Sequence, residues 1–441
     1  MSAAPPVAGT AGRRCTCTAC PLLCDDIPLT DAGAATDCVI GRDAFAAALP
    51  EAAAGQRAAT ASSRTASPRD AADPRVDLKD DALARAARVL AAGRRILLTG
   101  LADATVETVV AACDLAEAVG AAVDVGGADL AAAAGPTIAR AGRVTADWDE
   151  LRDRADLVIF WGCDPTSSHP RFIERFVTPP LVDSRPRRTI AIGPAAVPPA
   201  DRRHAHLPLD GDHLVEAARL LQLVLADGGE AAATNAVLAA VCHELAAAIR
   251  EASCVAIVTM AGGEDGLVAW SIVHLVRAIA HRRPVFELPL AAAGCAATTA
   301  AAVCTWRYGA AGAIARADRS GGRFLPAEAT AARLIARGEV DVVLAVGRLA
   351  PDVEAAITAA GPQLTVVRIS ATVAQPSVAS RSLWLRCADP LLTAGTMLRG
   401  DGRTVTLAPP RSSPLPSARE LLLSVHEAVA AARPPAAGGR A

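Results

Sequence analysis

From residue 77 onward, amphipathic segments alternate with short, continuous apolar runs. The amphipathic pattern predicts helices over 81–92, 104–119, 149–154, 214–226, 234–251, 267–281 and 418–431. The apolar runs predict buried strands over 94–100, 121–125, 155–162, 187–193, 254–263, 340–347, 363–370 and 383–387. Apolar strands that alternate with helices are typical of parallel sheets covered on both faces, so we expect an α/β fold.

Several predicted strands end on a glycine and pass directly into a helix. Ligands of such folds bind at the carboxyl ends of the strands, where glycine lets the backbone approach a phosphate. The corresponding loops are 100–103, 162–170, 193–199, 262–266 and 347–351. Because none carries a complete G-x-G-x-x-G motif, each is equally typical of an ordinary turn, and the ligand class stays open.

The start of the chain lacks this alternation and is rich in cysteine instead. A stretch rich in Ser, Ala, Pro and Arg then forms the clearest linker in the sequence. A length of 441 residues suffices for several domains, at about 100–200 residues each. We expect a cysteine-rich subdomain over 1–56, a linker over 57–76, α/β domains over 77–250 and 251–350, a C-terminal α/β part over 351–415, and a helix with a disordered tail over 416–441.

Composition excludes several classes of function. A formal net charge of −2 gives no electrostatic reason to bind nucleic acid or an anionic membrane. Lys79 is the only lysine, so the chain has no G-x-x-x-x-G-K-[ST] phosphate loop. No secretory signal is apparent over 1–12, and the uncharged run 288–306 is too weakly apolar for a membrane span. We therefore expect a cytoplasmic protein.

Five of the 12 cysteines lie within the first 38 residues. Cys17, Cys20 and Cys24 are spaced as C-x2-C-x3-C, and Cys38 follows after thirteen further residues. This spacing lets four thiolates hold a [4Fe–4S] cube, with Cys15 as a spare. Zinc is the alternative, although all-thiolate zinc sites usually have two matched C-x2-C pairs.

The segment CTACPLLCDDI resembles the B subunit of formylmethanofuran dehydrogenase, from a family of molybdopterin oxidoreductases related to formate dehydrogenase. Residues 155–172 resemble its "WGxNPxxxHPR" segment, and residues 304–309 and 388–402 resemble two further segments in the same order. The resemblance implies a formate dehydrogenase-like α/β fold with two interleaved α/β domains and a small N-terminal cysteine-rich subdomain. It also marks Gly162, Asp164 and His169 as candidates for a vestigial pterin-binding loop.

The chain departs from the family's dehydrogenases where their chemistry takes place. Residues 123–137 contain neither the Cys nor the His of the expected Cys-His-Gly segment. Alanine and glycine over 291–294 replace an expected catalytic arginine, and residues 193–202 lack the "DxRxTxT" pattern. Without these groups a molybdenum or tungsten site has little means to perform redox chemistry. We therefore expect no catalytic residue in this chain and no molybdopterin or tungstopterin.

This combination resembles the B subunit of formyltransferase/hydrolase complexes. The resemblance implies a non-redox scaffold in a complex that releases formate from formylmethanofuran, or an analogue, in tetrahydromethanopterin-linked one-carbon oxidation. Its implied partners are an amidohydrolase-like A subunit, the C subunit of the same complex and a formyltransferase subunit. The alternatives are an active molybdenum or tungsten dehydrogenase and a stand-alone iron–sulfur electron carrier, which would not need so much α/β sequence.

Three histidines lie close together in the segment DRRHAHLPLDGDH. His204 and His206 form an H-x-H pair, and His213 follows seven residues later. Such a pair suits zinc, but no Cys or Glu completes the set. We expect a solvated loop that enters a helix, with Asp210 or Asp212 near the N-cap.

Overall fold

The protein forms two compact units that are interleaved along the chain. The computed structural model describes residues 12–30, 33–49, 79–126, 128–194, 197, 203–227, 235–261, 266–291, 298–317, 323–326, 328–372 and 381–432. The first unit comprises 1–128, 296–399 and 404–441, and the second comprises 129–295 and 400–403. These units do not coincide with the consecutive domains expected over 77–250, 251–350 and 351–415, because the strands of the first unit come from both ends of the chain.

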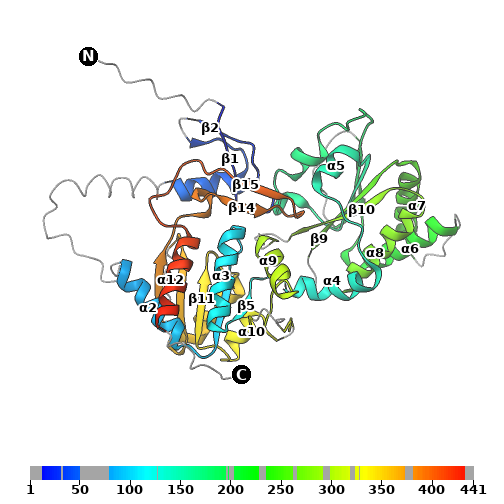
Figure 1. Cartoon of the computed structure of the whole chain (residues 1–441). Coiled ribbons are helices and arrows are strands. Elements are labelled where there is room, and N and C mark those ends of the chain that lie inside the picture. The colour runs from blue at the N-terminus through cyan, green and yellow to red at the C-terminus, as the bar shows by residue number, and fades with distance from the viewer. Residues whose placement is uncertain are drawn as a thin grey trace, which may run out of the picture. The chain divides into compact units, whose positions relative to one another are not determined.

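The first unit is built on a five-stranded parallel sheet (Figure 1). Its strand order is β13 (Arg381–Arg386), β12 (Thr365–Ser370), β11 (Val342–Val346), β4 (Ile96–Gly100) and β5 (Ala122–Asp124). Alternate side chains enter different cores: Ile96 and Leu98 pack with α2 (Lys79–Ala92), α3 (Val106–Val119) and α12 (Ala418–Ala432). Leu97 packs on the opposite face with α10 (Ala331–Ala336) and α11 (Pro351–Ala360). This double burial explains why the strands are continuous apolar runs.

The cysteine-rich segment belongs to the first unit. It contains the small antiparallel sheet of β1 (Arg14–Cys15), β2 (Ile27–Thr30) and β3 (Gly33–Ala34), followed by a helix over 39–49. The Thr16 N–H donates to the Ala408 carbonyl oxygen at 2.9 Å, and the Ala408 N–H donates to the Thr16 hydroxyl at 3.0 Å. These bonds tie the segment to the end of the hairpin β14 (Gly395–Leu398) and β15 (Thr404–Leu407).

The second unit has its own five-stranded parallel sheet. Its order is β10 (Val285–Ala291), β9 (Val255–Ala261), β6 (Leu157–Trp161), β7 (Arg188–Gly193) and β8 (His204–Pro208). The helices α6 (Leu214–Asp227), α7 (Ala236–Glu251) and α8 (Gly266–Ala280) cover one face. The other helical elements of this part of the chain are α4 (Ala128–Ala141), α5 (Trp148–Arg154), two 3-10 turns (Pro165–Ser167 and Gly211–His213) and a π-helical turn (Ile173–Val177).

The expectation of a solvated loop at His204–His206 is wrong, because these residues form the edge strand β8. His204 Nδ1 lies 2.9 Å from the Thr189 hydroxyl, and His206 Nε2 lies 3.0 Å from the Gly193 carbonyl oxygen. The two imidazoles therefore contact different groups of β7. Leu207 is the one buried residue of β8, so this strand lacks the continuous apolar run that predicts a strand buried on both faces.

Among the described residues, no helix combines the length and apolar character needed to cross a bilayer. The uncharged run 288–306 is divided between β10 and α9 (Thr298–Tyr308), with 292–297 outside the described residues. The expected linker over 57–76 and most of the expected C-terminal tail also lie outside them.

Candidate functional site

A cavity of about 640 Å³ lies in the first unit, at the carboxyl ends of β4, β11, β12 and β13. The chain leaves the neighbouring strands β4 and β11 toward opposite faces of the sheet, which is where open α/β sheets bind their ligands. Two of the loops that the sequence singled out, 100–103 and 347–351, contribute Asp103, Gly347 and Arg348 to the lining. The volume is that of an ordinary small-molecule site.

Gly347 allows the backbone after β11 to pass close to Asp103. Its φ of +68° lies in the left-handed region, and a Cβ at this position would lie 2.5 Å from Asp103 Oδ1. Burial raises the pKa of the Asp103 carboxyl, whereas the Arg348 guanidinium, 3.9 Å away, lowers it. The Arg348 side chain is 58% exposed, so its remaining N–H groups can reach a ligand.

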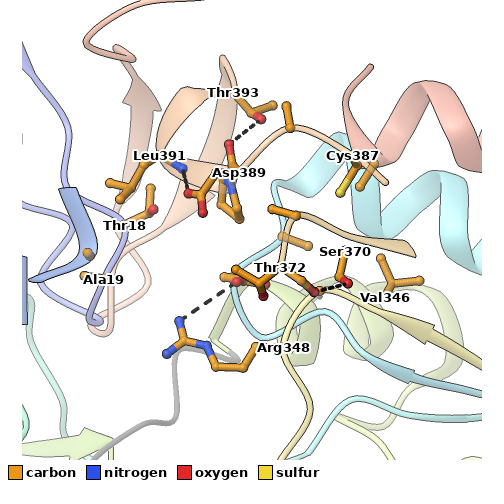
Figure 2. Close-up of a pocket in the computed structure, with 18 of the residues that line it drawn as sticks. Thr18, Ala19, Val346, Arg348, Ser370, Thr372, Cys387, Asp389, Leu391 and Thr393 are labelled. Carbon is orange, nitrogen blue, oxygen red and sulfur yellow. Dashed lines mark hydrogen bonds and ion pairs between the residues drawn. The ribbon is translucent and has the colours of Figure 1, made fainter. Parts of the chain in front are cut away.

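Two strands that the sequence did not associate with a site complete the lining. Arg368 of β12 binds Glu354 of α11 through two hydrogen bonds, of 2.8 and 2.7 Å. Asp389, after β13, accepts the Leu391 N–H at 2.9 Å. Figure 2 shows Thr18 and Ala19 of the cysteine-rich segment facing the cavity from one side, and Ser370 and Cys387 from the other. Hydroxyl groups, backbone groups and charged side chains of both signs thus line this cavity together with apolar side chains.

The cysteines expected to bind metal share one neighbourhood. The side chains of Cys17, Cys20 and Cys24 are buried, and Gly41 donates its N–H to Cys38 Sγ at 3.4 Å. Burial and, to a lesser degree, the neighbouring cysteines raise the pKa of Cys17 and Cys20 to about 12. Cys24 and Cys38 act electrostatically on both of these thiols, so the four sulfurs are close enough to influence one another.

Within the described part of the chain, no three His, Cys, Asp or Glu side chains are arranged around a single metal ion. A cube binds each thiolate at a different iron, so its ligands lie farther apart than those of one ion. The donor set of four neighbouring thiols thus fits a cluster, and the assignment of Cys17, Cys20, Cys24 and Cys38 stays a prediction.

The pterin-loop candidates Gly162 and Asp164 lie at the carboxyl end of β6, in the second unit. A Cβ at Gly162 would lie 2.5 Å from Leu214 Cδ1, so a side chain of the protein occupies the space in front of this glycine. The Asp164 carboxylate accepts the N–H of Thr166 at 2.9 Å and its hydroxyl at 2.7 Å. Gly162 therefore packs against Leu214, and Asp164 hydrogen-bonds to Thr166, within the second unit.

His169, the third candidate, is fully buried beside aromatic side chains. Its Nδ1 lies 2.8 Å from the Ser168 hydroxyl, and its ring meets the Trp148 ring edge-on at a centroid distance of 5.7 Å. Burial lowers the pKa of His169 to about 4, so its imidazole is neutral at pH 7. Its Nε2 is buried as well and has no hydrogen-bond partner among the described residues.

Residues 123–137, where the resemblance expects a metal-binding Cys-His-Gly segment, have near their start a carboxylate that binds backbone amides. This carboxylate belongs to the buried Asp124, the last residue of β5. The Asp124 carboxylate accepts the N–H groups of Gly126, Ala313 and Ala331, at 3.3, 3.1 and 2.7 Å. Three backbone amides bind these oxygens, and residues 123–137 contain no cysteine, so this segment supplies no thiolate ligand for a molybdenum or tungsten ion.

No family model matches this chain, and no curated protein matches it by sequence. Among solved structures, it is similar to a chain of the formyltransferase/hydrolase complex (FhcABCD) from Methylorubrum extorquens, determined in complex with methylofuran. That similarity has a TM-score of 0.66 at 21% identity and covers 81% of this chain and 97% of that chain.

The chain is also similar to acetylene hydratase from Pelobacter acetylenicus. Here the TM-score is 0.50 at 9% identity, and the similarity covers 94% of this chain and 70% of that chain. At these identities both similarities concern the fold. Together with the strand order, they confirm the expected α/β class with parallel sheets covered by helices.

Proposed function

We propose that this chain is a non-redox scaffold in a formyltransferase/hydrolase complex, the counterpart of its B subunit. The observation that carries the proposal is the extent of the structural similarity, which covers 97% of one chain of such a complex. In this proposal an amidohydrolase-like A subunit performs the hydrolysis that releases formate. The C subunit of the complex, together with a formyltransferase subunit, completes the assembly.

The absence of redox catalysis is supported by the residues at the expected metal position. Asp124 holds three backbone amides there, and Leu214 occupies the space beside Gly162. The polar cavity of the first unit then serves ligand binding or assembly rather than electron transfer. Cys17, Cys20, Cys24 and Cys38 would hold a [4Fe–4S] cluster, which transfers single electrons when bound.

Elemental analysis of the complex tests this proposal. The tagged full-length chain would be purified anaerobically with its natural partners, and Fe, Zn, Mo and W would be measured per chain. We expect about four irons, the content of one cube, no molybdenum or tungsten, and a co-purifying partner that releases formate without an electron acceptor. Stoichiometric molybdenum or tungsten would mean an active dehydrogenase, and a chain that purifies without partners would contradict the scaffold role.

Cysteine variants separate the cluster from the scaffold role. Cys24→Ala is expected to remove the iron and its visible absorbance, whereas Cys15→Ala, in the same segment, should retain both. Iron that survives in Cys24→Ala would show that these four cysteines are not the ligands. Co-purification of the partner proteins with Cys24→Ala would then report on assembly independently of the metal.

A further inference from the structure

The cysteine site and the cavity of the first unit share a wall. Thr18 and Ala19, in the loop between two of the expected metal ligands, face the cavity in Figure 2. The helix over 39–49 starts directly after Cys38, the fourth expected ligand. Four side chains of this helix line the same cavity: Ile40, Asp43, Ala44 and Ala47. A movement of the segment that holds the cysteines would therefore change the shape of the cavity.

The four cavity-lining residues occupy one face of the helix, since they follow the i, i+3, i+4, i+7 spacing of such a face. Phe45 and Ala48 lie on a different face and are buried, with exposed fractions of 3% and 1%. At the end of the helix, Arg411 donates a hydrogen bond to the Leu49 carbonyl oxygen. Packing along one face and this hydrogen bond anchor the C-terminal part of the helix.

The first turn of the helix is built on the cysteines. The Gly41 N–H donates to Cys38 Sγ at 3.4 Å, so the thiol caps the helix N-terminus as a side-chain oxygen does elsewhere. The Cys38 N–H donates to the Thr36 hydroxyl at 3.2 Å. A Cβ at Gly41 would lie 3.4 Å from Cys17 Sγ, so the sulfur of a second expected ligand also lies beside this turn.

The stability of this turn depends on how its sulfurs are held. A helix as short as this one is marginal in water by itself, so its caps and its packing decide whether it forms. Metal binding by cysteines adds its free energy to the folded arrangement of the ligands, because an unfolded chain has no preformed site. Loss of the metal would remove this contribution at the N-terminal end of the helix and leave the Arg411 hydrogen bond at the other end.

We propose that metal bound by Cys17, Cys20, Cys24 and Cys38 fixes the helix over 39–49, so that this wall of the cavity is ordered only when the cysteine site is loaded. The inference rests on the proposed function in one respect, the binding of a [4Fe–4S] cluster by these four cysteines. The site then has a structural task in a chain without redox catalysis, since it controls the shape of the cavity.

Hydrogen–deuterium exchange of the anaerobically purified full-length chain tests the proposal. Cys24→Ala removes a ligand that lies outside the helix, so its effect on residues 39–49 must pass through the shared site. We expect residues 39–49 to exchange at least about tenfold faster in Cys24→Ala than in the wild type. Residues 387–393, which line another part of the cavity, should also exchange faster. Cys15→Ala is the matched control, since this fully buried thiol of the same segment is not an expected ligand.

Iron is measured in every sample, so loss of metal and opening of the helix are separate results. Unchanged exchange of 39–49 in an iron-free Cys24→Ala chain would overturn the proposal and leave the cluster assignment intact. Wild-type chain from which a chelator has removed the iron shows whether an effect comes from the metal or from the substitution. An increase as large in α7 of the second unit, in both iron-free samples, would overturn the proposal because the metal would then stabilise the whole chain.

The cluster assignment and the scaffold role have readouts of their own. A wild-type chain without iron, or iron that survives in Cys24→Ala, would contradict the cluster assignment and with it this inference. Co-purification of the partner proteins, measured on the same samples, reports on the scaffold role whatever the exchange shows.

Discussion

Arg187 stabilises the second unit by binding main-chain carbonyl groups. Its side chain is buried, with Nε 2.9 Å from the Ala155 carbonyl oxygen and Nη1 2.6 Å from that of Pro179. It also donates to the carbonyl groups of Val177, Leu151 and Arg152. One guanidinium thus satisfies the end of α5 and the end of the π-helical turn, where helices leave carbonyls without partners.

Arg187→Ala is expected to lower the free energy of unfolding by about 3 kcal/mol, because several buried carbonyls lose their donor together. The control is Arg188→Ala. Arg188 pairs with Glu244, and both side chains are at least one-third exposed, so its loss should change stability by less than about 0.5 kcal/mol. Urea denaturation followed by tryptophan fluorescence measures both, and equal effects would disprove the role assigned to Arg187.

His169 makes the stability of the protein depend on pH. Its pKa is about 4 in the folded state because of burial, against about 6.5 in an unfolded chain. Between these values the unfolded state binds a proton that the folded state does not. Stability from this group is therefore complete above pH 6.5 and is lost as the pH falls toward 4, by up to about 3 kcal/mol.

His169→Gln removes this titration, so its stability should fall less steeply than that of the wild type between pH 6.5 and 4. Urea denaturation at several pH values in this range provides the measurement. His281→Gln, which alters an exposed histidine, is the control for the substitution itself. If His169→Gln and the wild type show the same slope, the imidazole is not buried in its neutral form.

At the scale of elements, the turn between β11 and α11 depends on a glycine for two separate reasons. Gly347 has a φ of +68°, and Asp103 Oδ1 occupies the space where a Cβ would lie. Gly338, after α10, has a φ of +65° but no atom within 4 Å of its Cβ position. Alanine variants of Gly347 and Gly338 therefore separate the cost of backbone strain, which both share, from the cost of moving Asp103, which applies to Gly347 alone.

Gly338→Ala should cost about 1 kcal/mol, the usual strain of a left-handed alanine. Gly347→Ala should cost about 1–2 kcal/mol more, because Asp103 must move from its place beside Arg348. Thermal unfolding of both variants measures the difference. An equal loss in the two variants would mean that Asp103 moves freely and does not define the cavity wall.

Most strands were predictable from their apolar runs, including the edge strands β5 and β13, whereas the edge strand β8 and the hairpin of β14 and β15 were not. The runs over 94–100 and 340–347 became β4 and β11, because both faces of these strands are buried. The edge strand β8 and the hairpin of β14 and β15 bury fewer side chains, so their sequences carry weaker periodicity. These elements are stabilised largely by backbone hydrogen bonds. Because nearly every residue carries the same backbone donor and acceptor, this pairing leaves no pattern in the sequence.

At the scale of the molecule, each unit has its own sheet and its own hydrophobic core. The first sheet pairs β4 with β11, which are separated in sequence by the whole of the second unit's main segment. The resemblance implied interleaved domains, but the local pattern marked only a consecutive series of helices and strands. Strand order cannot be obtained from that pattern, because parallel neighbours are joined by long connections.

The sequence by itself determined the α/β class, most strands and helices, the strand-end loops and the cysteine spacing, because these depend on neighbours along the chain. Only the tertiary structure decided which loops share a cavity. It placed Arg368, Asp389 and Thr18 around the loop of Gly347. Such contacts form when two helices or two strand ends pack together, and neither segment contains a signal that identifies its partner.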